Sequence, residues 1–212
     1  MKGNSTKAVT CRISTNALQT DDEHAYAGSK LAMQRSDLIP STHGEHMNIG
    51  LLLLRLGVGL TIAAHGAQML FGWFGGQGLA KTGQLFETLG FLPGRSYALL
   101  AALAELGGGV LLASGLATSL SAAIIFAVMI VAAFSAHIKQ GFFITDGGFE
   151  YTFVLSVAAL TVAFTGPGSF SLDAILGHSW SGGLWGLAAI LTGVLASIVP
   201  LAQRRQASAN LK

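Results

Sequence analysis

The chain has 212 residues, of which 51% are hydrophobic and 10% are charged, and its formal net charge is +2. Soluble globular domains carry roughly 25% charged residues, so this composition excludes a protein whose whole surface faces water. The single cysteine, Cys11, excludes an intrachain disulfide and a CxxC redox pair. No basic stripe or nucleic-acid-binding motif is present.

Residues 1–47 are polar, with basic and acidic side chains in equal number. Such a segment cannot bury enough apolar area to offset the entropy of ordering, so we interpret it as a disordered tail. A second interpretation is that translation naturally starts at Met47, which stands directly before the first apolar segment.

Apolar segments then alternate with glycine- and proline-containing loops, and none shows the period-two pattern of a membrane strand. A bilayer core of about 30 Å requires about 20 helical residues. The segment 151–164 is shorter than this length. Only helices and closed barrels satisfy their own backbone in lipid. We predict an all-α membrane protein, with a four-helix transmembrane bundle in residues 48–177 and a fifth transmembrane helix with a basic tail in residues 178–212. The segments are Ile49–Phe71, Tyr97–Leu116, Leu120–Ile138, Tyr151–Phe164 and Gly183–Leu201.

Lysine and arginine mark one side of the membrane. With five spans, the loops that contain Lys81, Arg95 and Lys139 share a side with the Arg204-Arg205 tail, whereas the connections around Ala117 and Ser169 contain no basic residue. Because cytoplasmic loops are rich in lysine and arginine, we expect the C-terminus to lie in the cytoplasm.

Two charged residues lie within apolar segments. Arg55 follows four leucines in the first segment, and Glu105 lies near the middle of the second. Because charge inside a bilayer is costly, we predict an Arg55–Glu105 ion pair that holds the bundle together. The alternative is that Arg55 extends to the interface and that Glu105 is protonated.

Small residues recur at helical spacing in the first three segments. They are Gly57, Gly59, Ala63 and Gly66 in the first, Ala98, Ala102, Gly107, Gly108 and Gly109 in the second, and Ala132, Ala133 and Ala136 in the third. Such residues let helix backbones approach closely in membranes, so we expect these faces to pack.

Titratable groups from three segments converge on the side that we expect to be cytoplasmic. His65 lies near the inner end of the first helix, His137 ends the third, and Glu150 begins the fourth. Histidine can relay protons, and aromatic loops can hold a flat ring such as a quinone head group. The alternative is an aromatic belt with interfacial histidines. No metal is expected, because HxxxH and HExxH spacings are absent. The aromatic candidates are Trp73, Phe74, Phe142 and Phe143.

Two further residues belong to the opposite side. We interpret Asp173 as an interfacial cap or turn residue. His178, beside Trp180, has no assigned role.

Several motifs together resemble the DoxX family. They are Leu54-Arg55-Leu56-Gly57-Val58-Gly59, Ala64-His65-Gly66-Ala67-Gln68, Phe71-Gly72-Trp73-Phe74-Gly75-Gly76, Ala104-Glu105-Leu106-Gly107-Gly108-Gly109, Gly141-Phe142-Phe143, Gly147-Gly148-Phe149-Glu150 and Thr165-Gly166-Pro167-Gly168. The resemblance covers about residues 48–177 and implies a four-helix bacterial inner-membrane protein. Relatives include the membrane subunit of archaeal thiosulfate:quinone oxidoreductase and proteins linked to thiol systems through soluble enzymes. Relatives that handle dithiols use membrane cysteines, which this chain lacks, so direct disulfide chemistry is not expected.

From residues and resemblance together, we expect the membrane subunit of a redox system that couples a sulfur compound or a soluble partner enzyme to quinone. His65, His137 and Glu150 would bind the quinone and relay protons. The alternative is a non-enzymatic scaffold or small-solute carrier that docks a soluble partner. The oligomeric state, including a homo-oligomer, stays open.

Overall fold

The computed structural model describes residues 42–178 and 180–210. The predicted tail therefore falls mostly outside the described residues. The first helix, α2, begins at Thr42, so residues 42–47, which we had assigned to the tail, are helical. Residues Glu45–Lys212 form one compact unit, and the description below concerns that unit.

All regular elements in the described residues are helices, which confirms the predicted all-α class. Three 3-10 turns and one π-helical turn accompany the α-helices. The α-helices are α2 (Thr42–Phe71), α3 (Gly78–Thr88), α4 (Gly94–Ser114), α5 (Thr118–Ala132), α6 (Glu150–Thr165), α7 (Leu172–Ile175) and α8 (Gly183–Asn210). The π-helical turn is Ala133–His137, and the 3-10 turns are Trp73–Gly75, Ile138–Gln140 and Ile144–Asp146.

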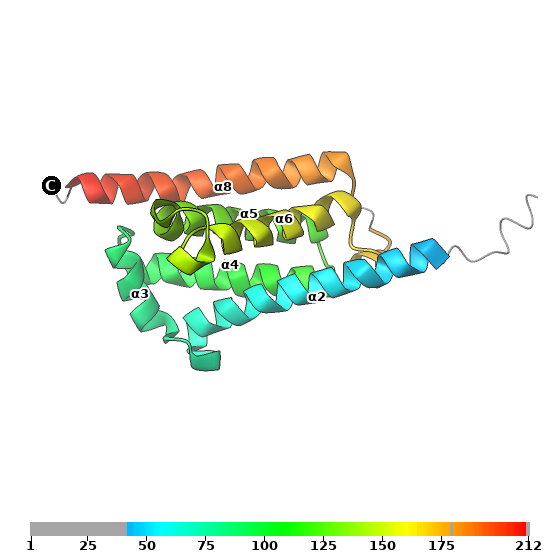
Figure 1. Cartoon of the computed structure of the whole chain (residues 1–212), viewed down its shortest axis with the longest axis horizontal. Coiled ribbons are helices and arrows are strands. Elements are labelled where there is room, and N and C mark those ends of the chain that lie inside the picture. Colours follow the sequence, from blue (N-terminus) through cyan, green and yellow to red (C-terminus); the bar gives the residue numbers. More distant parts are fainter. Residues whose placement is uncertain (1–41, 179, 211–212) are drawn as a thin grey trace, which may run out of the picture. The chain divides into compact units, whose positions relative to one another are not determined.

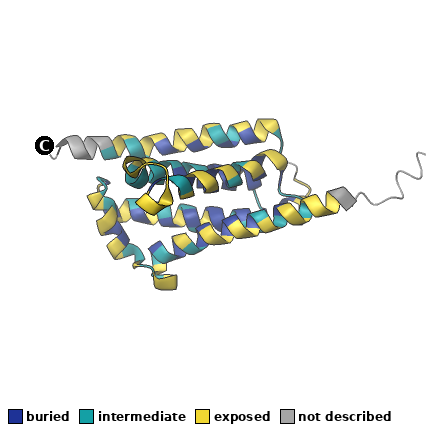
Figure 2. Cartoon of the chain, viewed as in Figure 1, coloured by how far each residue is buried: buried dark blue, intermediate teal, exposed yellow. Residues whose placement is uncertain are grey.

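In the described part of the chain, four helices are long and apolar enough to cross a membrane: Gly44–Phe71, Gly94–Ser114, Thr118–Gln140 and Gly183–Arg204. The apolar α6 has 16 residues, a length of about 24 Å at ~1.5 Å per residue. It is the segment that the sequence marked as short. Large apolar side chains such as Leu60 and Leu195 are exposed, so lipid would contact them. Exposed positions recur along the long helices of the bundle (Figure 2). The protein is therefore a multi-pass membrane protein.

The five long helices lie side by side and alternate in direction (Figure 1). The central helix is α5, which packs against α4, α6 and α8. The fully buried apolar core includes Ile62, Leu112, Ile125 and Val162, one residue from each of α2, α4, α5 and α6. The short helix α3 packs on α4 and lies at the end of the bundle where α2 ends.

Helices α2 and α4 cross with their backbones in contact. A Cβ atom on Gly59 would lie 2.6 Å from the carbonyl oxygen of Gly109, and one on Gly66 would lie 2.7 Å from that of Ala102. Real Cβ atoms do not approach so closely, so this crossing requires glycine. The predicted packing of small residues is thus confirmed for these positions, whereas nothing lies within 4 Å of a Cβ at Gly57 or Gly107. The contacts also set the register, because they place Glu105 level with His65.

We predict that Gly109→Ala lowers the thermal stability of the detergent-solubilised protein. The added methyl would lie 2.5 Å from the nitrogen of Ala63 and from the carbonyl oxygen of Gly59, and overpacking of this kind costs about 1–3 kcal/mol. Gly107→Ala in the same helix is the matched control, because nothing lies within 4 Å of a Cβ at that position. Equal melting temperatures for the two variants would show that the crossing is not as tight as described.

Candidate functional site

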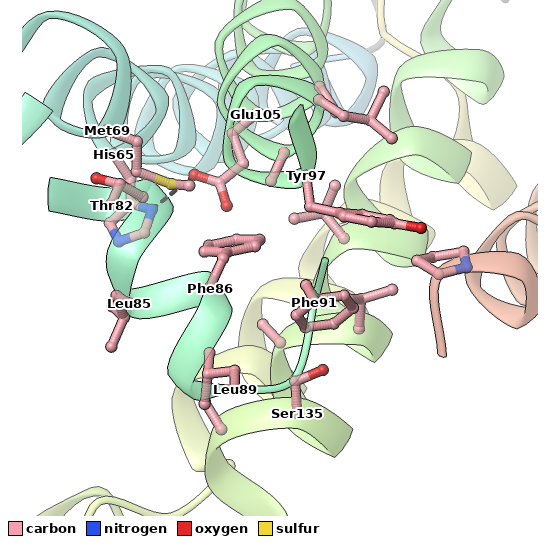
Figure 3. A pocket seen from close by; sticks show the side chains of 18 of the residues that line it. His65, Met69, Thr82, Leu85, Phe86, Leu89, Phe91, Tyr97, Glu105 and Ser135 are labelled. Atoms are coloured by element: carbon pink, nitrogen blue, oxygen red, sulfur yellow. Dashed lines mark hydrogen bonds and ion pairs between the residues drawn. The ribbon is translucent and has the colours of Figure 1, made fainter. Parts of the chain in front are cut away.

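A cavity of about 640 Å³ lies at the end of the bundle that α3 covers (Figure 3). Small-molecule sites usually have volumes of about 300–1,000 Å³ and mainly apolar walls. Residues of α2, α3, α4, α5, the π-helical turn and α8 line the cavity, and most of them are aliphatic or aromatic. Its size and composition are therefore those of a site for a small, largely apolar molecule.

The main polar group in the wall is a pair formed by His65 and Glu105. Nδ1 of His65 lies 2.6 Å from Oε2 of Glu105. Only 6% of the Glu105 side chain is exposed, whereas 57% of the His65 side chain is exposed. A buried carboxylate requires such a partner, because an unpaired charge in an apolar environment is very costly. The pair thus joins a buried carboxyl group to an imidazole that the surroundings can reach (Figure 3).

His137 is the second histidine in the wall. It ends the π-helical turn Ala133–His137, and such turns occur often at functional sites. Its Nδ1 lies 2.7 Å from the carbonyl oxygen of Gly147. Because a carbonyl oxygen only accepts, we assign the proton to Nδ1, which leaves Nε2 as an acceptor in the neutral ring. The structure therefore brings His65 and His137 to one cavity.

The structure corrects the expectation for Glu150. This residue does not line the cavity. Its Oε2 accepts a hydrogen bond of 2.9 Å from the backbone nitrogen of Ile144, and its own backbone nitrogen donates to the carbonyl oxygen of Phe142. Glu150 closes the loop before α6, because the six-residue separation from Ile144 lets its side chain reach back across the turn.

The aromatic candidates are also corrected, because none of the four lines the cavity. Their exposed fractions range from 42% to 72%, which suits an aromatic belt at the membrane surface. The rings that line the cavity are Phe86, Phe91 and Tyr97. Two of them belong to α3 and the turn after it, a segment that the sequence analysis treated as a loop. The four outlying aromatic residues are Trp73, Phe74, Phe142 and Phe143.

The predicted Arg55–Glu105 pair is wrong. The α2–α4 register places Arg55 next to Gly115. Gly115 directly follows α4 and is ten positions beyond Glu105. Arg55 is 1% exposed, and its Nη2 donates to the carbonyl oxygen of Phe170 at 2.5 Å. Asp173 lies close enough to interact electrostatically with Arg55. Arg55 therefore joins α2 to the loop before α7, at the opposite end of the bundle.

Asp173 also caps α5, as its interpretation as a cap residue predicted. Its carboxylate accepts hydrogen bonds from the backbone nitrogens of Ala117 and Thr118, at 2.8 and 3.0 Å, and from the hydroxyl of Thr118 at 2.7 Å. The ring of His178 stacks on that of Trp180, and its backbone nitrogen donates to the carbonyl oxygen of Asp173, so it belongs to the same end of the bundle. It does not line the cavity.

Arg204 does not line the cavity but contacts residues that do, a role that the sequence analysis missed. Its Nε donates to the carbonyl oxygen of Leu89 at 2.6 Å, and Nη1 and Nη2 donate to those of Phe134 and Ser135 at 3.1 Å each. The guanidinium carbon also lies 6.0 Å from the centre of the Phe91 ring. Arg204 thus joins α8 to the end of α3 and to the π-helical turn of the third span.

The fold and the site define the class of protein. It is a helical multi-pass membrane protein with an apolar cavity, and a histidine–carboxyl pair lies in the wall of that cavity. The model of the DoxX family matches residues 50–138, which contain His65, Glu105 and His137. Two curated relatives extend the match. "Putative oxidoreductase CatD" of Bacillus subtilis (strain 168) is 33% identical over 129 residues, 61% of this chain and 88% of the relative. "Inner membrane protein YqjF" of Escherichia coli (strain K12) is 31% identical over 126 residues, 58% of this chain and 95% of the relative.

The chain belongs to the DoxX family, which confirms the resemblance carried by its motifs. No solved structure shows a significant match to it.

We predict that His65 and Glu105 are energetically coupled. In a double-mutant cycle with His65→Ala and Glu105→Gln, residues in contact show coupling of about 0.5–3 kcal/mol. The matched cycle of Arg55→Lys with Glu105→Gln is expected to be additive, because a separation of ten positions places Arg55 about 15 Å from His65 along α2. Thermal unfolding in detergent measures both cycles, and coupling only in the second would restore the Arg55–Glu105 pair.

Proposed function

We propose that this protein is the membrane subunit of a redox system and that its cavity binds a quinone. The observation that supports this proposal most is the cavity itself, which lies among membrane-spanning helices and is apolar except for a few groups such as the His65–Glu105 pair. The name of one relative, "Putative oxidoreductase CatD", agrees with a redox role. The name of the relative YqjF agrees with an inner-membrane location for the present protein.

The residues present fit a quinone head group. A quinone is a flat, apolar ring with carbonyl oxygens at opposite edges, and the rings of Phe86, Phe91 and Tyr97 provide aromatic surface in the cavity wall. A protonated Glu105 or an imidazole N–H of His65 would donate a hydrogen bond to one of these oxygens. Reduction of the bound quinone would consume two electrons and two protons. We propose that a sulfur compound or a soluble partner enzyme supplies the electrons.

The protons would come through the protein. The exposed part of the His65 ring would take up a proton from the membrane surface, and Nδ1 would pass it to Glu105 over the 2.6 Å contact. His137 is held by Gly147 through one nitrogen, so its other nitrogen is free to contact the ligand. Glu150 has no part in this proposal, because its carboxylate holds the loop to Ile144.

We predict that the purified, detergent-solubilised protein contains a quinone in near-stoichiometric amount. Organic extraction followed by mass spectrometry would measure it. The double variant His65→Ala/His137→Ala is expected to lose the quinone, because it removes two polar groups of the cavity wall. His178→Ala, at the other end of the bundle, is the matched control and should retain it.

Two outcomes would contradict this assignment. Quinone that persists in the double variant would show that the cavity is not its site. A folded wild-type protein without quinone would favour the scaffold or small-solute carrier, and a soluble protein that co-purifies with it would then be the first object of study.

We further propose that the C-terminus lies in the cytoplasm. Lys81, Arg95, Lys139 and Arg204 all belong to the α3 end of the bundle, and basic residues collect on the cytoplasmic side. An alkaline phosphatase fused after Lys212 is therefore expected to be inactive, and a green fluorescent protein fused there to fluoresce. The opposite result would reverse the topology and place His65 near the outer surface.

A further inference from the structure

The cavity does not end at the histidine–carboxyl pair but continues along α5 between α4 and α8. Its lining there is entirely apolar and includes Leu100 and Ala104 of α4, Ala127 and Val131 of α5, and Ala196 and Pro200 of α8. In the described residues α5 packs along both neighbours, whereas α4 and α8 share no comparable packing. The side chains of α5 are therefore the floor of a groove, and α4 and α8 are its walls.

The groove lies at the depth of the hydrocarbon core. Ala127 is in the middle of the third span, and Ala104 is in the middle of the second. Leu100 is 62% exposed, and Ala196 is also exposed, so the groove reaches the outer surface of the bundle. Only lipid would contact this surface at that depth.

The end of the groove nearest the α3 side is closed by polar contacts. The hydroxyl of Tyr97 donates to Oε1 of Gln203, and Arg204 donates to the carbonyl oxygens of Leu89 and Phe134. These contacts join α8 to α4, α3 and the π-helical turn across the end of the groove. A molecule in the groove would thus leave sideways into lipid rather than towards water at this end.

We infer that the cavity admits its ligand from the bilayer through the gap between α4 and α8, and that the groove holds the apolar tail of a lipid-borne quinone. The inference rests on the proposed function, and it adds the class of quinone and the direction of entry. The head group would lie beside Glu105, and the tail would lie against Ala127 and Ala196. The short side chains of Ala104, Ala127 and Ala196 line this part of the groove.

The tail gains little hydrophobic free energy in the groove, because it moves there from lipid that is equally apolar. What the groove provides is a continuous apolar path, so a tailed quinone reaches Glu105 without passing through water. A rigid cavity closed to the bilayer would exclude such a molecule, whatever the chemistry of its head group.

Photoaffinity labelling of the full chain in lipid nanodiscs tests this inference. Two probes are used, a tail-less benzoquinone with a diazirine on the ring and a prenylated benzoquinone with a diazirine in the tail. Peptide mass spectrometry locates the labelled residues. We expect the ring probe to label residues near His65 and Glu105, and the tail probe to label the groove-lining residues of α4, α5 and α8.

A pair of neighbouring variants sharpens the test. Ala196→Trp places an indole in the groove, so it should strongly reduce labelling by the tail probe while leaving labelling by the ring probe unchanged. Leu195→Trp is the matched control, because Leu195 is 64% exposed on the same helix and does not line the groove. Leu195→Trp should alter labelling by neither probe.

The outcomes separate the two proposals. Ring labelling near Glu105 with tail labelling outside the groove, or with tail labelling that Ala196→Trp does not reduce, would overturn the inference and leave the quinone site intact. Labelling by neither probe would overturn both proposals.

Discussion

The contact between the backbones of α2 and α4 is the constraint on which the site depends. Gly59, Gly66 and Gly109 bring the two helices so close that a methyl group would not fit between them. At this distance the helices have little freedom to slide, so the register that places Glu105 level with His65 is fixed by packing. The pair then follows from the cost of burial, because a glutamate side chain that is only 6% exposed among membrane-spanning helices has few alternatives to a nearby imidazole. The His65–Glu105 pair is thus a consequence of the close backbone packing between α2 and α4.

The sequence was sufficient to predict the apolar helices but not to predict which residue pairs with Glu105. Apolar runs report directly on membrane helices, and all of the predicted segments became helices. The Arg55–Glu105 prediction relied on depth estimated from the ends of each span, and an error of a few turns at those ends exceeds the length of a side chain. The glycines carried better information. In the structure Gly59 faces Gly109 and Gly66 faces Ala102, and both pairs belong to one antiparallel register, which excludes Arg55 as the partner of Glu105.

Other parts of the site depend on contacts between distant segments. Helix α3 is short and contains Lys81 and Glu87, so it has no membrane signal, although Thr82, Phe86 and Leu89 recur at the spacing of one helical face. That spacing was the available clue to the aromatic wall. The contacts of Arg204 offered none, since its acceptors are carbonyl oxygens at the end of α3 and in a π-helical turn. Glu150 and the four outlying aromatic residues show the reverse error, because lying on the same side of a membrane does not bring residues to one cavity.

The two halves of the cavity have different origins in the chain. His65, Glu105 and His137 all fall within residues 50–138, the part that the family model matches. The wall formed by Ala196 and Pro200 and the closure by Arg204 come from α8, which lies outside that part. In the proposed function, the chemistry of the head group therefore belongs to the shared helices, while the shape of the groove depends on the additional one. A family member with a different helix in the place of α8 could keep the same proton-relaying pair and accept a ligand with a different tail, because the groove wall changes without any change at Glu105.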